Sequence, residues 1–119
     1  MIADQVFQQS SGKWCLIGVF NEIVAPRFPI VHHSLGLFVE LADAEGEYDV
    51  GIDFCNASFQ VLSPLRGMRI QVPNRLRSVQ FGVQTYNLPI PAPGRYFFKL
   101  YFGNEAATVD IPIDVRPIG

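Results

Sequence analysis

The sequence predicts an all-β protein: a single domain over residues 1–119, built as a two-sheet antiparallel sandwich, immunoglobulin-like or a related Greek key, with about eight or nine strands. Turn-forming residues recur at short intervals, and the segments between them have strand length and are rich in Val, Ile, Phe and Tyr. Short strands with turns about every 8–12 residues are typical of sandwiches and barrels. A chain of 119 residues fits one domain.

The expected strands are 3–9, 14–24, 35–42, 47–55, 58–63, 68–72, 77–88, 95–102 and 105–115. The fourth alternates cleanly, because Val50, Ile52 and Phe54 point one way and Asp49, Gly51 and Asp53 point the other. Successive side chains of a strand point to opposite faces, so the three apolar residues define a core face.

The last strand follows the same rule, with Val109, Ile111, Ile113 and Val115 on its predicted core face. Pro112 interrupts this strand. Proline cannot donate a hydrogen bond to a neighbouring strand, so we expect an edge position or a bulge there.

Three further segments bear on the topology. Gly103-Asn104 predicts a tight hairpin between the last two strands. The long connection from Ala25 to Ser34 holds two prolines and predicts a crossing between sheets. Segment 77–88 also has apolar residues at helical spacing, but Gly82 and its β-branched residues favour a strand.

Composition excludes several classes of protein. Hydrophobic residues make up 49% and charged residues 17%, against a usual charged share of about 25%, which excludes disorder. The net charge of −2 argues against a nucleic-acid partner, and the interrupted cluster Arg66, Arg69, Arg75 and Arg77 is explained as a solvated loop. No apolar run reaches the ~18 residues of a membrane span, so no membrane partner is expected.

The N-terminus has neither a basic nor an apolar region of a secretory signal. With Met1 as the start, we expect a cytoplasmic protein, in a compartment where disulfides are rare. Cys15 lies in an apolar strand and is expected in the core, whereas Cys55 follows Asp53 at a spacing of two and is expected to be exposed.

The chain resembles a family of small bacterial proteins known as a domain of unknown function. The resemblance spans most of the chain and is carried by Ala3-Asp4, Gly12-Lys13, Leu16-Ile17-Gly18-Val19-Phe20, Ala25-Pro26-Arg27-Phe28-Pro29 and His32-His33. The later Pro93-Gly94-Arg95-Tyr96 is similar to the start of a late strand in many immunoglobulin-like sandwiches. These motifs are structural, so the resemblance implies a β-sandwich and no chemistry.

No catalytic, cofactor or metal site is predicted. His32 and His33 are adjacent and point to opposite sides of an extended chain, so they chelate one metal poorly. Asp43, Glu45 and Glu47 fall short of a calcium-loop pattern. The carboxylate pairs Asp49 with Asp53, and Asp110 with Asp114, are four residues apart on a strand, about 13 Å, which is too far for joint acid–base work.

Aromatic residues, at 13%, are the unusual feature, and the strand at 95–102 is aromatic on both faces. Tyr96, Phe98, Leu100 and Phe102 suit the core, which leaves Phe97 and Tyr101 on the other face. Either a subunit contact or a neighbouring loop, such as 25–34, covers these two rings, because monomers seldom expose a large apolar patch.

The sequence therefore predicts a non-enzymatic interaction or structural module. Its expected partner is a protein, most simply a second copy of the chain in a homo-oligomer, with Phe97 and Tyr101 in or beside the contact. The alternative is a ligand-binding domain that holds a sugar or a hydrophobic peptide on an exposed aromatic face. The pattern identifies no particular small-molecule ligand.

Overall fold

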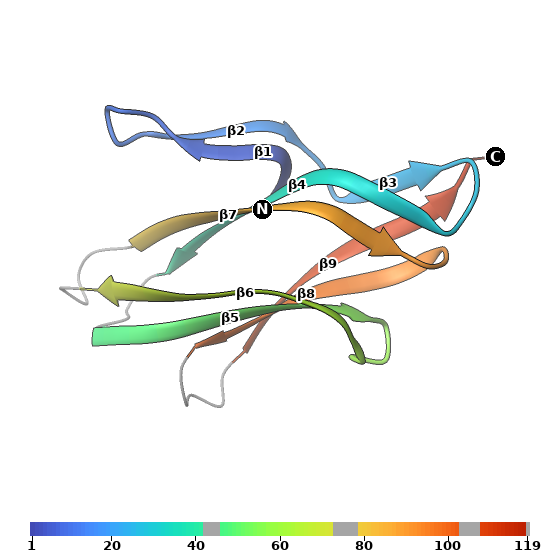
Figure 1. The fold of residues 1–119 in the computed structure, drawn as a ribbon. Helices are drawn as coiled ribbons and strands as arrows, with labels where there is room; N and C mark the ends of the chain where they lie inside the picture. The colour runs from blue at the N-terminus through green and yellow to red at the C-terminus, as the bar shows by residue number, and fades with distance from the viewer. Residues whose placement is uncertain (42–45, 73–78, 103–107, 119) are drawn as a thin grey trace. The chain divides into compact units, whose positions relative to one another are not determined.

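A computed structural model describes residues 1–41, 46–72, 79–102 and 108–118, which form strands and no helix. The strands are β1 (Ile2–Gln8), β2 (Trp14–Val19), β3 (Glu22–Ala25), β4 (Ile30–Leu41), β5 (Gly46–Asn56), β6 (Val61–Val72), β7 (Val79–Ile90), β8 (Gly94–Phe102) and β9 (Thr108–Pro117). They lie in two sheets, of order β2-β1-β4-β7 and β3-β9-β8-β5-β6 (Figure 1). The predicted all-β, two-sheet sandwich is confirmed.

Several predicted strands have different limits in the structure. Segment 14–24 is two strands, because the chain leaves the four-stranded sheet after β2 and enters the five-stranded sheet at β3. Segment 77–88 is a strand, as predicted, over Val79–Ile90. Its burial alternates through Phe81 and Val83, which excludes the helical alternative there.

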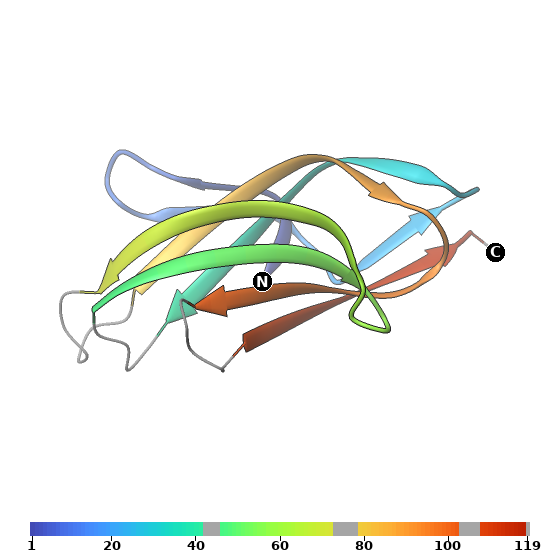
Figure 2. The same ribbon diagram turned by 60° about the horizontal axis from the view of Figure 1, so that its bottom comes forward.

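The separate strands predicted at 58–63 and 68–72 are wrong, since both segments contribute to the single strand β6. Pro64 lies inside β6 and pairs with Asp53 of β5. A proline is tolerated there because β6 is the edge strand of its sheet and has a neighbour on one side only. Figure 2 shows β5 and β6 side by side as one long, curved hairpin.

The connection after β3 does cross between the sheets, as predicted, although β4 already begins at Ile30. Strands β8 and β9 are neighbours, which agrees with a hairpin, but its predicted turn at Gly103-Asn104 lies outside the described residues. Arg75, Arg77, Asp43 and Glu45 also lie outside them.

Strand β9 departs from the predictions in several ways. It pairs in parallel with β3, from Glu22 opposite Asp114 to Ala25 opposite Pro117, so the sandwich is not wholly antiparallel. Strand β9 lies between β3 and β8, so the predicted edge position of this strand is wrong. Pro112 is tolerated because it precedes the pairing with β3 and has no β3 residue opposite it. Ile113 and Val115 are buried as predicted, whereas Val109 is 41% exposed.

The chain divides into two compact units, and β9 contributes to both. The first holds residues 1–40, 80–93 and 114–119, and the second holds residues 41–79 and 94–113. In the second unit, Phe54 stacks on Tyr96 with ring centroids 5.1 Å apart and an angle of 8° between the rings. Phe98 also packs on Phe54, with centroids 5.1 Å apart. Aromatic packing therefore forms the centre of this unit.

In the first unit, the β1–β2 hairpin lies against the face of β4 and β7 (Figure 1). Two glycines permit this approach. A Cβ atom on Gly36 would lie 2.6 Å from Cγ2 of Val6, and one on Gly82 would lie 2.6 Å from Cγ1 of Val6 and 2.7 Å from Cζ3 of Trp14. The Trp14 ring also packs on Phe38 at 5.7 Å. The hairpin thus fits into two positions that lack side chains.

The side chain of Gln84 fastens β1 to this face. Its Oε1 accepts from the backbone N–H of Val6 at 3.0 Å, and its Nε2 donates to the carbonyl of Asp4 at 2.9 Å. The same Nε2 donates to Oγ of Ser34 at 2.7 Å, and Ser34 Oγ donates to the Asp4 carbonyl at 3.2 Å. Gln84 therefore satisfies the backbone of β1 after its direct pairing with β4 at Ile2 and Ala3.

We expect Gly82→Ala to lower the free energy of unfolding by about 1–3 kcal/mol, because the new methyl group would overlap Val6 and Trp14. Gly51→Ala is the matched control, since a Cβ there meets only Tyr101, at an ordinary 3.7 Å. Urea unfolding of both variants measures the difference. Equal stability of the two would contradict the close packing of the hairpin.

Candidate functional site

The strongest candidate for an interaction surface lies on the unburied face of β5 and β8. Across these strands, Asp53 is opposite Lys99 and Cys55 is opposite Phe97. Phe97, Lys99 and Tyr101 are half-buried, whereas the alternate residues of β8 are buried: Tyr96, Phe98, Leu100 and Phe102. The two faces of β8 are therefore as predicted.

A further aromatic residue, Phe59, lies on this face. Its ring stacks on Phe97 with centroids 4.8 Å apart and an angle of 19°. The ammonium group of Lys99 lies 5.4 Å from the centre of the Phe59 ring and 5.5 Å from that of Tyr101, within the range of cation–π attraction. We call Phe59, Phe97, Lys99 and Tyr101 the aromatic ladder. Its outermost ring is Phe59, which is 46% exposed.

Phe59 comes from the turn between β5 and β6, so part of the cover over Phe97 is a loop of the same chain. Its role is missed in the sequence because Phe59 falls within the strand predicted at 58–63. The available signal was Asn56-Ala57, which predicts a turn just before it.

The turn holds Phe59 in an uncommon conformation. Phe59 has a φ of 59°, in the left-handed region that glycine and asparagine ordinarily occupy. Asn56 organises the turn: its Oδ1 accepts from the backbone N–H groups of Ser58 and Gln60, both at 3.0 Å, and its carbonyl accepts from that of Phe59 at 2.9 Å. A bulky residue in this region costs about 1–3 kcal/mol. The turn therefore displays an exposed aromatic ring at the expense of local stability.

The thiol nearest the ladder, that of Cys55, is not activated. Burial raises the pKa of the Cys55 thiol, and the Asp53 charge raises it further, so the thiol stays protonated at neutral pH. Cys55 is fully buried, which corrects the prediction that it is exposed; Cys15, expected in the core, is half-buried. Both cysteines are free. Burial also raises the pKa of Tyr101, as does its hydrogen bond with Asp53.

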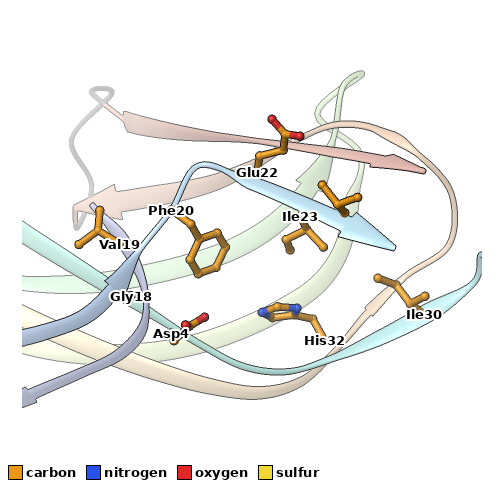
Figure 3. A pocket seen from close by; sticks show the side chains of 9 residues that line it. Asp4, Gly18, Val19, Phe20, Glu22, Ile23, Ile30 and His32 are labelled. Atoms are coloured by element: carbon orange, nitrogen blue, oxygen red, sulfur yellow. The ribbon is translucent and has the colours of Figure 1, made fainter. Parts of the chain in front are cut away.

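The first unit carries a second candidate, an open pocket of about 390 Å³ (Figure 3). Asp4, which is exposed, and His32, which is half-buried, both line it, and the Phe20 ring packs against the imidazole with centroids 5.9 Å apart. Gly18 makes room for the carboxylate, because a Cβ atom on Gly18 would overlap the Asp4 side chain. Gly18 also has a φ of 71°, which favours glycine.

His32 is the electrostatically unusual group of this pocket. Burial lowers its pKa, although the nearby Asp4 charge and a backbone hydrogen bond at Ser34 act in the opposite direction. The imidazole is therefore neutral at pH 7. Its Nε2 atom is buried and has no hydrogen-bond partner among the described residues.

Of the other predicted polar positions, Asp110 lies close enough to the aromatic ladder for its charge to raise the pKa of Tyr101. His33 is exposed, as are Asp49, Asp110 and Asp114. Among the described side chains, no three His, Cys, Asp or Glu residues gather as ligands for a metal ion. The described part of the chain also holds no helix with the length and apolar character needed to cross a membrane.

A family model covers residues 1–116 of the chain, and its description is "Family of unknown function (DUF6941)". The chain belongs to this family. The predicted resemblance to a family of unknown function is thus confirmed, and DUF6941 supplies no activity. No curated protein and no solved structure was found to match the chain.

Three of the motifs that carried the resemblance meet at one place in the structure. Asp4, Gly18, Phe20 and His32 come from three of those motifs and all line the pocket of the first unit. Their separation in sequence concealed this arrangement, since only the hairpin and β4 bring them together.

We expect acid to destabilise the protein partly through His32. Its folded pKa lies below the value of about 6.5 that it has when unfolded. The unfolded chain therefore takes up the proton first, and stability is lost as the pH falls from about 6.5 through the lowered folded pKa. His32→Gln should show a smaller fall in urea midpoint between about pH 7.5 and 5.5 than the wild type.

His33→Gln is the control for this experiment, because His33 is the exposed neighbour of His32. It should keep most of the acid sensitivity of the wild type, because the His33 charge is the smallest of the contributions to the His32 pKa. The same loss of stability in His32→Gln as in the wild type would show that His32 is not the responsible group.

Proposed function

We propose that this DUF6941 chain is a non-enzymatic interaction module that self-associates as a two-fold dimer through the aromatic ladder. The observation that carries the proposal is Phe59: a bulky, exposed ring held in the left-handed region and stacked on Phe97. Strained backbone persists where the surrounding structure enforces it, and it concentrates at binding sites. Aromatic rings are enriched in the centres of protein interfaces.

The composition of this face supports a second copy as the occupant. In a two-fold contact, a surface patch meets the same patch of the other subunit, so it must be self-complementary. The ladder places the Lys99 cation between rings, beside Asp53 on the opposite strand. Two antiparallel copies of such a face would bring Lys99 of one subunit near the Asp53 carboxylate of the other, with the Phe59 rings packed between them.

Neighbouring apolar surface extends the patch. Val61 of β6 is paired with Cys55, in the same cross-strand row as Phe97, and is 47% exposed. The Phe97 ring stacks on the Phe59 ring, so replacing Phe97 would alter both the stability of the protein and its exposed apolar surface. Phe59 is therefore the more selective probe of the interface predicted at Phe97 and Tyr101.

We expect Phe59→Asn to convert the dimer to a monomer without a loss of stability above about 1 kcal/mol. Asparagine tolerates the left-handed conformation, and the relief of strain offsets the lost stacking of about 0.5–1.5 kcal/mol. Light scattering coupled to gel filtration at tens of micromolar protein measures the mass, and urea unfolding measures stability.

Phe7→Asn is the matched control, because Phe7 is the same residue type, is 43% exposed and lies on β1 in the other unit. It should remain a dimer. A monomeric wild type would overturn self-association and favour the alternative, a sugar or hydrophobic peptide bound to the same rings. Dissociation by Phe7→Asn but not by Phe59→Asn would place the contact on the first unit instead.

A further inference from the structure

The pocket at Asp4 and His32 carries an unneutralised negative charge. The Asp4 carboxylate has no ion pair or hydrogen bond with any side chain in the described ranges, and Asp4 uses only its backbone carbonyl in the contacts with Gln84 and Ser34. The other carboxylate of the pocket, Glu22, is paired with the guanidinium of Arg116. Asp4 is thus the charge that a ligand would meet.

His32 supplies a hydrogen-bonding group next to that charge. Figure 3 shows the imidazole and the Asp4 carboxylate facing each other among the side chains that line the pocket. Its Nε2 atom is buried and lacks a partner among the described residues, a state that costs about 1–3 kcal/mol for a polar atom. A ligand that donates a hydrogen bond would remove this cost.

The remaining walls are apolar. Phe20 packs against the imidazole, Ile23 is buried, and Ile30 and Val24 also line the pocket. An aromatic face attracts a cation, and aliphatic walls favour an alkyl chain over a fully hydrated ion. The volume of about 390 Å³ is near the lower end of the range for small-ligand sites, about 300–1,000 Å³.

We propose that this pocket binds a primary alkylammonium group, with the nitrogen between the Asp4 carboxylate and His32 Nε2 and the alkyl chain along Ile23 and Ile30. A primary ammonium has three N–H donors and no acceptor. One donor bonds to the carboxylate, one bonds to the imidazole nitrogen, and the third remains for water at the open mouth. The group belongs either to a free small amine or to a lysine side chain.

The pocket chemistry disfavours other ligand classes. An anion would meet the Asp4 charge without a compensating cation, since Arg116 is engaged by Glu22. A neutral alcohol of the same size can form the hydrogen bond to His32 but gains no attraction to the carboxylate. The site is in the first unit and the aromatic ladder is in the second, so this inference does not depend on the proposed self-association.

The test is a titration of the ¹⁵N-labelled full chain, near neutral pH, with n-butylammonium and, separately, with the isosteric n-butanol. We expect saturable shifts of the Gly18, Phe20 and His32 amide signals with n-butylammonium, and affinity at least about tenfold weaker for n-butanol. Equal binding of both probes would reduce the site to an apolar pocket and overturn the proposal, as would the absence of saturable shifts. This comparison uses the wild type and needs no variant to fold.

Asp4→Asn should weaken n-butylammonium binding by about tenfold or more, the loss expected for an ion pair with a charge-assisted hydrogen bond. Glu40→Gln is the matched control, because Glu40 is an exposed carboxylate of the same unit that accepts from Gln80, outside the pocket. It should bind as the wild type does. Unchanged affinity in Asp4→Asn would overturn the assignment.

Nα-acetyl-lysine N-methylamide distinguishes the two sources of the ammonium group. Tighter binding of this compound than of n-butylammonium indicates a lysine side chain of a protein partner, because the added backbone amides then make contacts of their own. Tighter binding of n-butylammonium indicates a free amine. Binding of neither compound overturns the proposal.

Discussion

The close approach of the β1–β2 hairpin to β4 and β7 is the constraint on which the first unit depends. Val6 and Trp14 occupy the space that side chains at Gly36 and Gly82 would fill. This position of the hairpin brings the Asp4 carbonyl within reach of Gln84 and Ser34. It therefore also fixes the Asp4 carboxylate beside His32. A packing feature without any chemistry of its own thus determines the geometry of the pocket.

The second unit depends on the alternation of β8. Tyr96, Phe98 and Leu100 are buried, so Phe97 and Tyr101 must emerge on the opposite face. Because both faces of β8 are aromatic, the unburied face needs a cover of its own. The chain provides a partial one in Phe59, whose ring is itself 46% exposed. Phe59 covers part of the Phe97 ring but is itself exposed, so this face still presents apolar surface to solvent.

Features set by local periodicity could be predicted from the sequence, whereas features set by tertiary position could not. The core face of β5 and both faces of β8 are direct consequences of the period of two. In the sequence, Pro64 has the signature of a turn residue. It is tolerated inside β6 because β6 is an edge strand, and no local pattern reveals that position. The burial of Cys55 and the convergence of Asp4 with His32 depend on contacts between residues far apart in the chain. Such contacts leave no signal in a single sequence.

Both candidate sites coincide with local arrangements that oppose stability. Phe59 has a backbone conformation suited to glycine or asparagine, and His32 has a buried nitrogen without a partner in the described chain. Stable folds generally satisfy local preferences, and departures from them are expected at functional positions. Asn at position 59 would suit the backbone conformation better, and an apolar residue at position 32 would leave no buried nitrogen without a partner. The residues present retain an exposed ring and an unpaired hydrogen-bonding group, and a bound partner would stabilise both.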